Sequence, residues 1–177
     1  LEFRRVLFRS DLGTGIRTAL AQIVADEICV PFDHVTMILG DTQRTPDQGP
    51  TIASATLQVT SVPLRQAAAQ VRHLLMALAA KAFELPAEQL TAAAGQVFVT
   101  RSPGRSLSYA QLASGQNLHV MLDKNVQLNS ERQNHYVGRA VPRVDIPAKV
   151  SGGLTYVHDL RLPGMLHGRV VRPPYIG

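Results

Sequence analysis

The sequence has 177 residues, of which 45% are hydrophobic and 18% charged, which is the composition of a folded globular protein and excludes a disordered chain. Of its formal net charge of +5, three Arg and one Glu in the first ten residues contribute +2, and the remaining Arg and Lys residues are scattered without interleaved aromatic residues, which argues against a nucleic-acid partner. No apolar stretch approaches the roughly 20 residues that cross a bilayer, so we expect no membrane span.

The first ten residues, Leu1–Ser10, show neither a helical nor a strand period. Their last four residues, Leu7-Phe8-Arg9-Ser10, resemble the translation of a sequencing-adapter end. We therefore expect residues 1–10 to be a non-native segment that does not pack against the rest. Together with the abrupt end at Pro173–Gly177, this leads us to interpret the sequence as a fragment cut on both sides.

A helix is predicted over Gly13–Cys29, because apolar residues recur at helical spacing from Ile16 to Ile28. Thr14 is its candidate N-cap, since a hydroxyl can accept from the first free N–H groups. Pro31 disfavours helical backbone in the residue before it and so ends the helix.

The polar side of this helix carries Asp26 and Glu27, which we expect to be solvated. Cys29 is the single cysteine, so the chain by itself can form neither a disulfide nor a cysteine-held zinc or iron–sulfur site. Its apolar neighbours favour a buried structural thiol over a nucleophile. The β-branched and apolar run Val35–Leu39 is typical of a short strand.

A polar loop is expected over residues 41–52, followed by a second long helix that Leu85-Pro86 ends. This helix has two possible starts. Pro63 can occupy its first turn, where the missing N–H costs nothing. Alternatively, the helix begins near Ser54 and kinks at Pro63.

A hairpin that turns near Gly95 is predicted over Leu90–Thr100, and one or two helical turns over Ser108–Ala113. Leu118–Leu122 is a possible strand. Residues 123–136 are polar and weakly patterned, and we expect them to be a poorly packed linker. Three short strands are expected beyond the linker. They are Arg143–Ile146, Leu154–Val157 and Met165–Arg172.

Two segments carry residues suited to binding a ligand. Gly13-Thr14-Gly15 opens the first helix, where small residues admit a ligand and free N–H groups favour an anion. The second, Gly49–Thr56, is small and hydroxyl-rich and leads into the next helix. In isolation each is more often an ordinary turn or cap. Together they could hold one pyrophosphate-bearing ligand from two sides, so we expect them to lie close together.

At these segments the sequence resembles the cofactor domain of molybdenum hydroxylase large subunits, the xanthine dehydrogenase and aldehyde oxidase family. The resemblance rests on the run from Gly13 to Glu27, on Val35–Thr42 and on Pro50–Thr56. It implies that both segments contact a molybdopterin cofactor. The cofactor-binding residues implied are Gly13, Thr14, Gly15, Ala53, Ser54, Ala55 and Thr56.

Residues 137–152 and 156–174 resemble the entry to the hammerhead α/β domain of the same family. Here this region follows the glycine-turn helix, as in the permuted large subunits related to the beta chain of isoquinoline 1-oxidoreductase. The resemblance implies an α+β (α/β) fold. Its parts would be a partial molybdopterin-binding domain over residues 11–122, a linker over 123–136 and the start of a hammerhead domain over 137–177.

The resemblance further implies a molybdenum-dependent oxidoreductase that hydroxylates a small N-heteroaromatic or aldehyde substrate with oxygen from water. The cofactor would be molybdopterin in its cytosine dinucleotide form, and electrons would pass to [2Fe-2S] clusters on a small partner subunit. The family's glutamate base lies in a region that we do not find here. We therefore assign no catalytic residue, expect no protein ligand to the metal, and expect the fragment alone to be inactive.

Two other classes of protein remain open on the sequence alone. One is a non-catalytic module that binds a phosphate-bearing ligand through the two small-residue segments. The other is an assembly domain with a large exposed apolar face. The six histidines show no metal-ligand spacing on any one element, so a histidine metal site is not expected.

Overall fold

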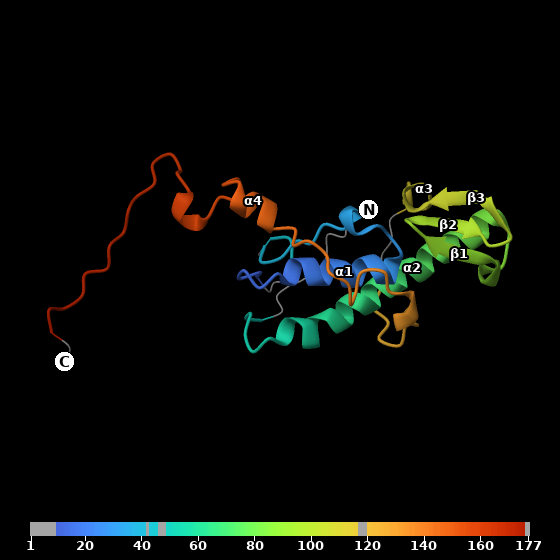
Figure 1. The fold of residues 1–177 in the computed structure, drawn as a ribbon, viewed down its shortest axis with the longest axis horizontal. Helices are drawn as coiled ribbons and strands as arrows, with labels where there is room; N and C mark the ends of the chain where they lie inside the picture. Colours follow the sequence, from blue (N-terminus) through green and yellow to red (C-terminus); the bar gives the residue numbers. More distant parts are fainter. Residues whose placement is uncertain (1–9, 42, 46–48, 117–119, 176–177) are drawn as a thin grey trace. The chain divides into compact units, whose positions relative to one another are not determined.

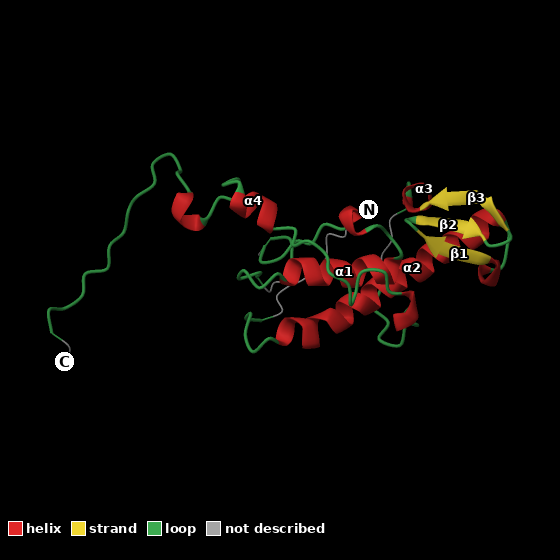
Figure 2. Ribbon diagram, viewed as in Figure 1, coloured by secondary structure: helices red, strands yellow, loops and turns green. Residues whose placement is uncertain are grey.

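A computed structural model of the chain describes residues 10–41, 43–45, 49–116 and 120–175. The chain forms two compact units, Leu1–Val144 and Asp145–Gly177. The first unit holds two long helices and a small antiparallel sheet, so the expected α+β class is confirmed (Figures 1 and 2). Within the described ranges, no helix has the length and apolarity needed to cross a membrane. Residues 1–9 lie outside these ranges, so for them the expectation of a segment that does not pack stays a prediction. For Ser10 the expectation is wrong, because its carbonyl accepts from the hydroxyl of Thr51 at 3.3 Å.

The centre of the first unit is a pair of helices, α1 (Ile16–Ile28) and α2 (Ser61–Phe83), which contact each other. The apolar stripe predicted for the first helix is its buried face, since Leu20 and Val24 are fully buried. The buried residues of α2 are Leu64, Ala68, Ala69, Leu75 and Ala79. Because three of these five are alanines, the backbones of the two helices can approach closely.

Each of the two expected starts of the second helix is confirmed in part, because helical backbone begins near Ser54 and Pro63 occupies the first turn of α2. A π-helical turn over Thr56–Thr60 leads directly into α2, and Pro63 lies in the first turn of α2. Proline has no N–H, so the carbonyl of Val59, four residues earlier, loses its α-helical donor. The wider spacing of a π turn next to such a position is a common accommodation of this loss.

The sheet consists of β1 (Leu90–Ala93), β2 (Gln96–Val99) and β3 (Ser102–Ser108), antiparallel and in that order. Its register pairs Leu90 with Val99, Ala93 with Gln96, and Gln96 with Ser108. The predicted hairpin is confirmed, with both turn residues, Ala94 and Gly95, at positive φ. The third strand was not predicted, because its Ser-Pro-Gly-Arg start lacks the β-forming residues on which strand prediction relies.

The short helix α3 (Tyr109–Ala113) confirms the predicted helical turn. It begins with a capping box, in which the Ser108 hydroxyl accepts from the backbone of Gln111 and the Gln111 side chain accepts from the backbone of Ser108. The Tyr109 hydroxyl then donates to the carbonyl of Ile28 at 2.8 Å. This bond attaches the sheet region to the C-terminal end of α1.

The strand expected at Val35–Leu39 is wrong, because this segment is extended but pairs with no strand in the described part of the chain. Met37 is 4% exposed, so the apolar pattern reflects burial against the core and not strand pairing. The strand expected at Leu118–Leu122 is also absent over residues 120–122, while residues 118 and 119 lie outside the described ranges.

The second unit contains a short helix, α4 (Ile146–Val150), and a 3-10 turn over Val157–Asp159. None of the three strands expected beyond residue 142 forms in its described residues. Pro147 lies at the start of α4, where its fixed φ favours a helix. Leu166 and Val171 are 92% and 90% exposed, and a strand is not stable without a partner that covers its apolar side. The start of a hammerhead domain at residue 137 stays a prediction.

Candidate functional site

A cavity of about 330 Å³ lies between the start of α1 and the segment that leads into α2. Five of the seven predicted cofactor-binding residues line it: Thr14, Gly15, Ala53, Ser54 and Thr56. The expectation that the two small-residue segments lie close together is therefore confirmed. The remaining two, Gly13 and Ala55, do not line the cavity. A Cβ on Gly13 would meet nothing within 4 Å, and the N–H of Ala55 closes a turn onto the carbonyl of Ile52 at 3.1 Å.

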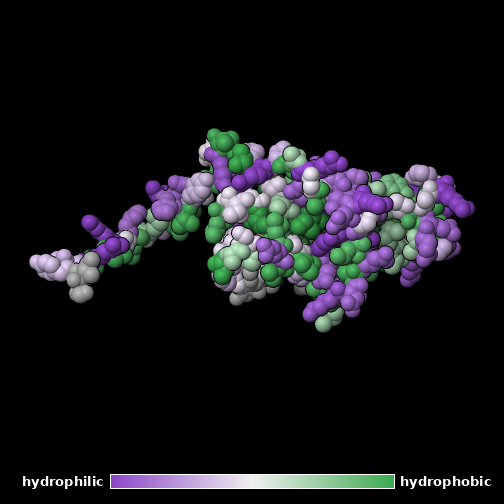
Figure 3. All heavy atoms as spheres, turned by 60° about the horizontal axis from the view of Figure 1, so that its bottom comes forward, coloured by the Kyte–Doolittle hydropathy of each residue, from purple (hydrophilic) through white to green (hydrophobic). Residues whose placement is uncertain are grey.

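The cavity is lined by six further residues that were not among the predicted cofactor-binding residues: Leu12, Ile16, Ala19, Thr51, Ile52 and Leu57. Most of them are apolar, and Leu12 and Ile52 are 71% and 61% exposed. Figure 3 shows that the surface of the first unit carries groups of hydrophobic residues between polar ones. An apolar wall with a few hydroxyl groups suits a flat organic ring better than a free phosphate. The signal was present in the apolar residues that flank each small-residue motif.

The start of α1 is capped by a side chain that the sequence analysis did not name. The carboxylate of Asp11 accepts from the N–H groups of Gly13 at 3.0 Å, Gly15 at 3.2 Å and Arg17 at 3.2 Å. Thr14 was predicted as the N-cap and is not, because Gly15 holds that position and the Thr14 hydroxyl itself donates to Asp11. A negative charge at a helix start is favourable, so the chain's own carboxylate occupies the place expected for an anion.

The segment that leads into α2 is built differently. Ala53 and Ser54 have φ of 53° and 52°, a left-handed conformation that L-residues other than Asn and Asp rarely adopt. No side chain among the described residues caps the N–H groups of the following π turn. The Thr56 side chain is buried, whereas Ser54 is exposed beside the cavity. This helix start therefore offers more free donors than the first one, where Asp11 accepts from three N–H groups.

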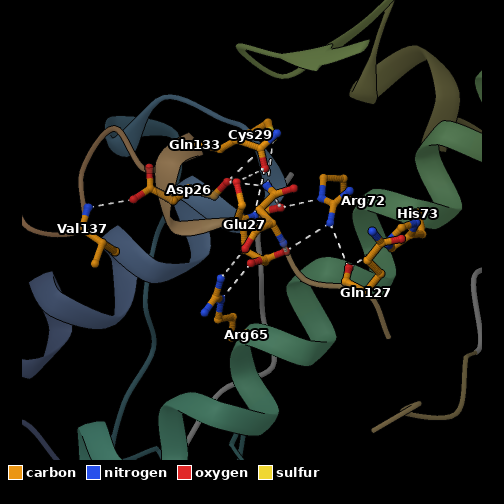
Figure 4. A network of polar contacts seen from close by, with 11 residues as sticks. Asp26, Glu27, Cys29, Arg65, Arg72, His73, Gln127, Gln133 and Val137 are labelled. Carbon is orange, nitrogen blue, oxygen red and sulfur yellow. Dashed lines mark hydrogen bonds and ion pairs between the residues drawn. The ribbon is translucent and has the colours of Figure 1, made fainter. Parts of the chain in front are cut away.

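The far end of α1 carries two buried carboxylates (Figure 4). They were expected to be solvated, and this expectation is wrong, since Asp26 is 6% and Glu27 1% exposed. The Asp26 carboxylate accepts from the backbone N–H groups of His135, Tyr136 and Val137, at 2.7–3.1 Å. Three backbone donors around one carboxylate satisfy a charge that would otherwise be costly to bury.

Glu27 joins α1 to α2, because its carboxylate accepts from Arg65 Nε at 2.9 Å and from an Arg72 amino group at 3.1 Å. It also accepts from the backbone N–H of Asn129 at 2.8 Å. The Asn129 side chain in turn donates to the carbonyls of Asp26 and Glu27. The poorly packed linker expected at residues 123–136 is therefore wrong, because backbone groups of this segment supply partners to both buried carboxylates.

Cys29 lies at the end of the same helix and accepts a hydrogen bond from the Asn129 side chain at 3.5 Å. Burial raises the pKa of the Cys29 thiol, against the opposite effect of this bond. Such a thiol is mostly protonated at neutral pH and is a poor nucleophile. Over the described ranges, no three His, Cys, Asp or Glu residues cluster as metal ligands would.

A family model described as the molybdopterin cofactor-binding domain matches residues 9–147. The chain belongs to the molybdopterin cofactor-binding domain family. The resemblance to molybdenum hydroxylases is thus confirmed, and the molybdopterin cofactor expected from it agrees with the family. The matched range contains all the residues that line the cavity and both buried carboxylates.

Two relatives of this cofactor-binding domain align with 94% of the chain. A nicotinate dehydrogenase subunit from Pseudomonas putida is 54% identical to it, and the beta chain of isoquinoline 1-oxidoreductase from Brevundimonas diminuta is 27% identical. The chain spans 14% and 26% of their lengths. Among solved structures, CO dehydrogenase from Oligotropha carboxidovorans matches with a TM-score of 0.52 and 23% identity, over 59% of this chain and 13% of that one. This last likeness shows a shared fold.

Proposed function

We propose that this chain forms part of the molybdopterin site of a molybdenum-dependent oxidoreductase that acts on a small N-heteroaromatic compound such as nicotinate. The observation that carries the proposal is the cavity shared by the two segments that resemble the family's cofactor contacts. The match to the cofactor-binding family and the 54% identity to part of a nicotinate dehydrogenase support it. An aldehyde is the alternative substrate class.

The residues present fit such a cofactor on two counts. The wall of the cavity combines apolar side chains with the hydroxyl-bearing Thr14, Ser54 and Thr56, which suits a pterin ring with polar edges. The uncapped start of the π turn offers backbone donors to a phosphate. A volume of about 330 Å³ is at the lower limit of ligand sites, so these walls would hold one part of a dinucleotide cofactor.

The two helix starts would then have different roles. The N–H groups at Ala53 and Ser54 and the Ser54 hydroxyl would bind the phosphates of the cofactor. The start of α1 would form part of the cavity wall and would not bind the phosphates, because Asp11 already accepts from three of its N–H groups. When bound, the molybdenum centre supplies the two-electron oxidation of the substrate with oxygen from water.

The finer assignments rest on the same resemblance. The cofactor would be the cytosine dinucleotide form, and a small partner with [2Fe-2S] clusters would accept the electrons. Residues 11–122 would belong to the molybdopterin-binding domain and residues 137–177 to the start of a hammerhead domain. The rival function, a module that holds a phosphate ligand from both helix starts, is disfavoured because Asp11 would repel an anion at the first of them.

Ser54 allows a test in which only charge changes. Asn and Asp have similar shapes and both tolerate left-handed φ, so Ser54→Asn and Ser54→Asp should fold equally well. Asp at a helix start even favours the helix, but would repel a bound phosphate. In the complete enzyme we expect Ser54→Asn to retain its molybdenum and Ser54→Asp to lose most of it, measured by metal analysis and by nicotinate oxidation. Equal molybdenum content in the two variants would contradict this role of the α2 start.

A further inference from the structure

One segment follows α1 along its whole length in the opposite direction. We call residues 129–144 the strap. Its successive contacts move from the C-terminal end of the helix to its start. Asn129 binds Glu27, the backbone of 135–137 binds Asp26, and Gln22 donates to the carbonyls of Tyr136 at 2.6 Å and Arg139 at 3.2 Å. The Val144 N–H then donates to the buried hydroxyl of Thr18 at 3.1 Å.

The last contact of the strap reaches the cavity. An amino group of the Arg143 guanidinium donates to the carbonyl of Gly13 at 3.1 Å. Its side chain also covers Gly15, since a Cβ on Gly15 would lie 3.1 Å from Arg143 Nε and 3.3 Å from Cδ and Cζ. Gly15 lines the cavity and has φ of 80°. Glycine is thus required there twice, by the left-handed backbone and by the neighbouring side chain.

We propose that Arg143 is a positioning residue for the molybdopterin site, which holds the Gly13–Gly15 turn in the shape that lines the cavity. This inference rests on the proposed function and deepens it. A turn with two left-handed glycines has many accessible conformations, and Asp11 fixes only its N–H side. Arg143 fixes the carbonyl side and closes the space beside Gly15.

The placement also explains why the strap needs a fixed register. Arg143 is 130 positions from Gly13 in sequence, and contacts at intermediate points help to hold its guanidinium at the Gly13 carbonyl. The Asp26 and Thr18 contacts supply such points. The strap thereby connects the buried carboxylates at one end of α1 to the cavity at the other.

The test compares Arg143→Ala with Arg132→Ala in the complete enzyme. Arg132 has the same charge, lies in the same strap and is exposed, and its side chain has no bonding partner in the described part of the chain. We expect Arg143→Ala to increase hydrogen exchange in a peptide covering residues 12–17 and to lower molybdenum retention roughly ten-fold, the scale of one hydrogen bond to a charged donor. Arg132→Ala should change neither. Arg143→Lys should partly restore exchange protection, because lysine can still donate to the Gly13 carbonyl.

The readouts separate the two proposals. Faster exchange in residues 12–17 of Arg143→Ala supports the positioning role even if the wild-type enzyme contained no molybdenum, a result that would overturn the proposed function alone. Unchanged exchange in this peptide overturns the positioning role, whatever the metal content. An equal increase in hydrogen exchange throughout the first unit would also overturn the positioning role, because Arg143 would then stabilise the fold in general.

Gly15 gives an independent check through a double-mutant cycle. Gly15→Ala adds a methyl group against Arg143, whereas in the Arg143→Ala background only the left-handed strain remains. We expect Gly15→Ala to accelerate exchange of residues 12–17 less in the Arg143→Ala background than in the wild type. Additive effects of the two substitutions would contradict direct packing of Arg143 on the turn.

Discussion

The two helix starts that form the cavity are opposites in construction. The start of α1 has glycine at its left-handed positions, a carboxylate that caps three N–H groups, and an arginine on its carbonyl side. The start of α2 has Ala53 and Ser54 at its left-handed positions and no side-chain cap within the described residues. The first start is satisfied by the chain itself, while the second keeps strain and free donors. Strained, uncapped backbone is tolerated where a ligand supplies the missing partners, so the comparison favours the α2 start as the side of the proposed site where an anion would bind.

The largest effect is expected at Glu27, which joins α1 to α2 and to the strap. Glu27→Gln removes a buried charge and leaves two arginines, Arg65 and Arg72, without their anion. Breaking one side of a buried ion pair costs about 3 kcal/mol or more. Urea unfolding should show this loss, with Glu88→Gln, an exposed position in the turn before β1, as a neutral control. A loss below about 1 kcal/mol would mean that the strap is held by other contacts.

The cap of α1 should contribute the next largest amount. Asp11→Ala removes the acceptor for the N–H groups of Gly13, Gly15 and Arg17, and we expect it to lower the free energy of unfolding by about 1–2 kcal/mol. Asp11→Asn keeps an amide oxygen as acceptor and should cost less. If Asp11→Ala instead improves phosphate binding without loss of stability, the two helix starts are more alike than their structures indicate.

Glycine substitutions at the α2 start test for backbone strain through their effect on the stability of the protein. Ala53→Gly relieves a left-handed residue and should stabilise the protein by about 0.5 kcal/mol after the entropy cost of glycine. Ala55, two residues later, has ordinary right-handed backbone with φ of −74°, so Ala55→Gly should destabilise by a similar amount. Thermal unfolding should therefore shift in opposite directions. The same sign for both variants would remove the argument for strain.

The smallest effect concerns Cys29, which lies at the C-terminal end of α1 beside Asn129 of the strap. Its folded pKa is raised by burial, so the folded protein keeps the thiol proton at pH values where the unfolded chain loses it. The free energy of unfolding is unaffected below about pH 8.5 and falls slightly above it. Alkylation by iodoacetamide at neutral pH should be slow in the wild type and faster in Glu27→Gln, where the strap is released. Equal rates in both would show that the strap does not shield the thiol.

Sequence patterns anticipated the parts of this fold that depend on neighbouring residues. The helices around Leu20 and Leu75, the hairpin at Gly95 and the capped turn at Ser108 all have local signals of period, turn type or capping. The proximity of the two small-residue segments was predicted from the needs of a single pyrophosphate-bearing ligand and confirmed as a shared cavity.

Most of the errors concern partners that are distant in sequence. Asp26 and Glu27 look like solvated residues of an amphipathic helix until residues 129–137 cover them. Thr14 has the right chemistry for a cap, but Asp11 has the same chemistry with a charge and a better position. The segment Val35–Leu39 has a strand composition, and composition does not reveal whether another strand is available to pair with it.

The strap also sets an order of events in folding. Its contacts with α1 and with the turn before α1 join residues between 102 and 130 positions apart, whereas the hairpin and both helices close over short distances. Contacts between distant residues close the longest loops and form late. On a ribosome, α1 would emerge and become helical well before Arg143 is synthesised, and the turn at Gly15 would wait for it. If the Gly13–Gly15 turn needs Arg143 to line the proposed molybdopterin site, insertion of the cofactor would follow folding of the first unit.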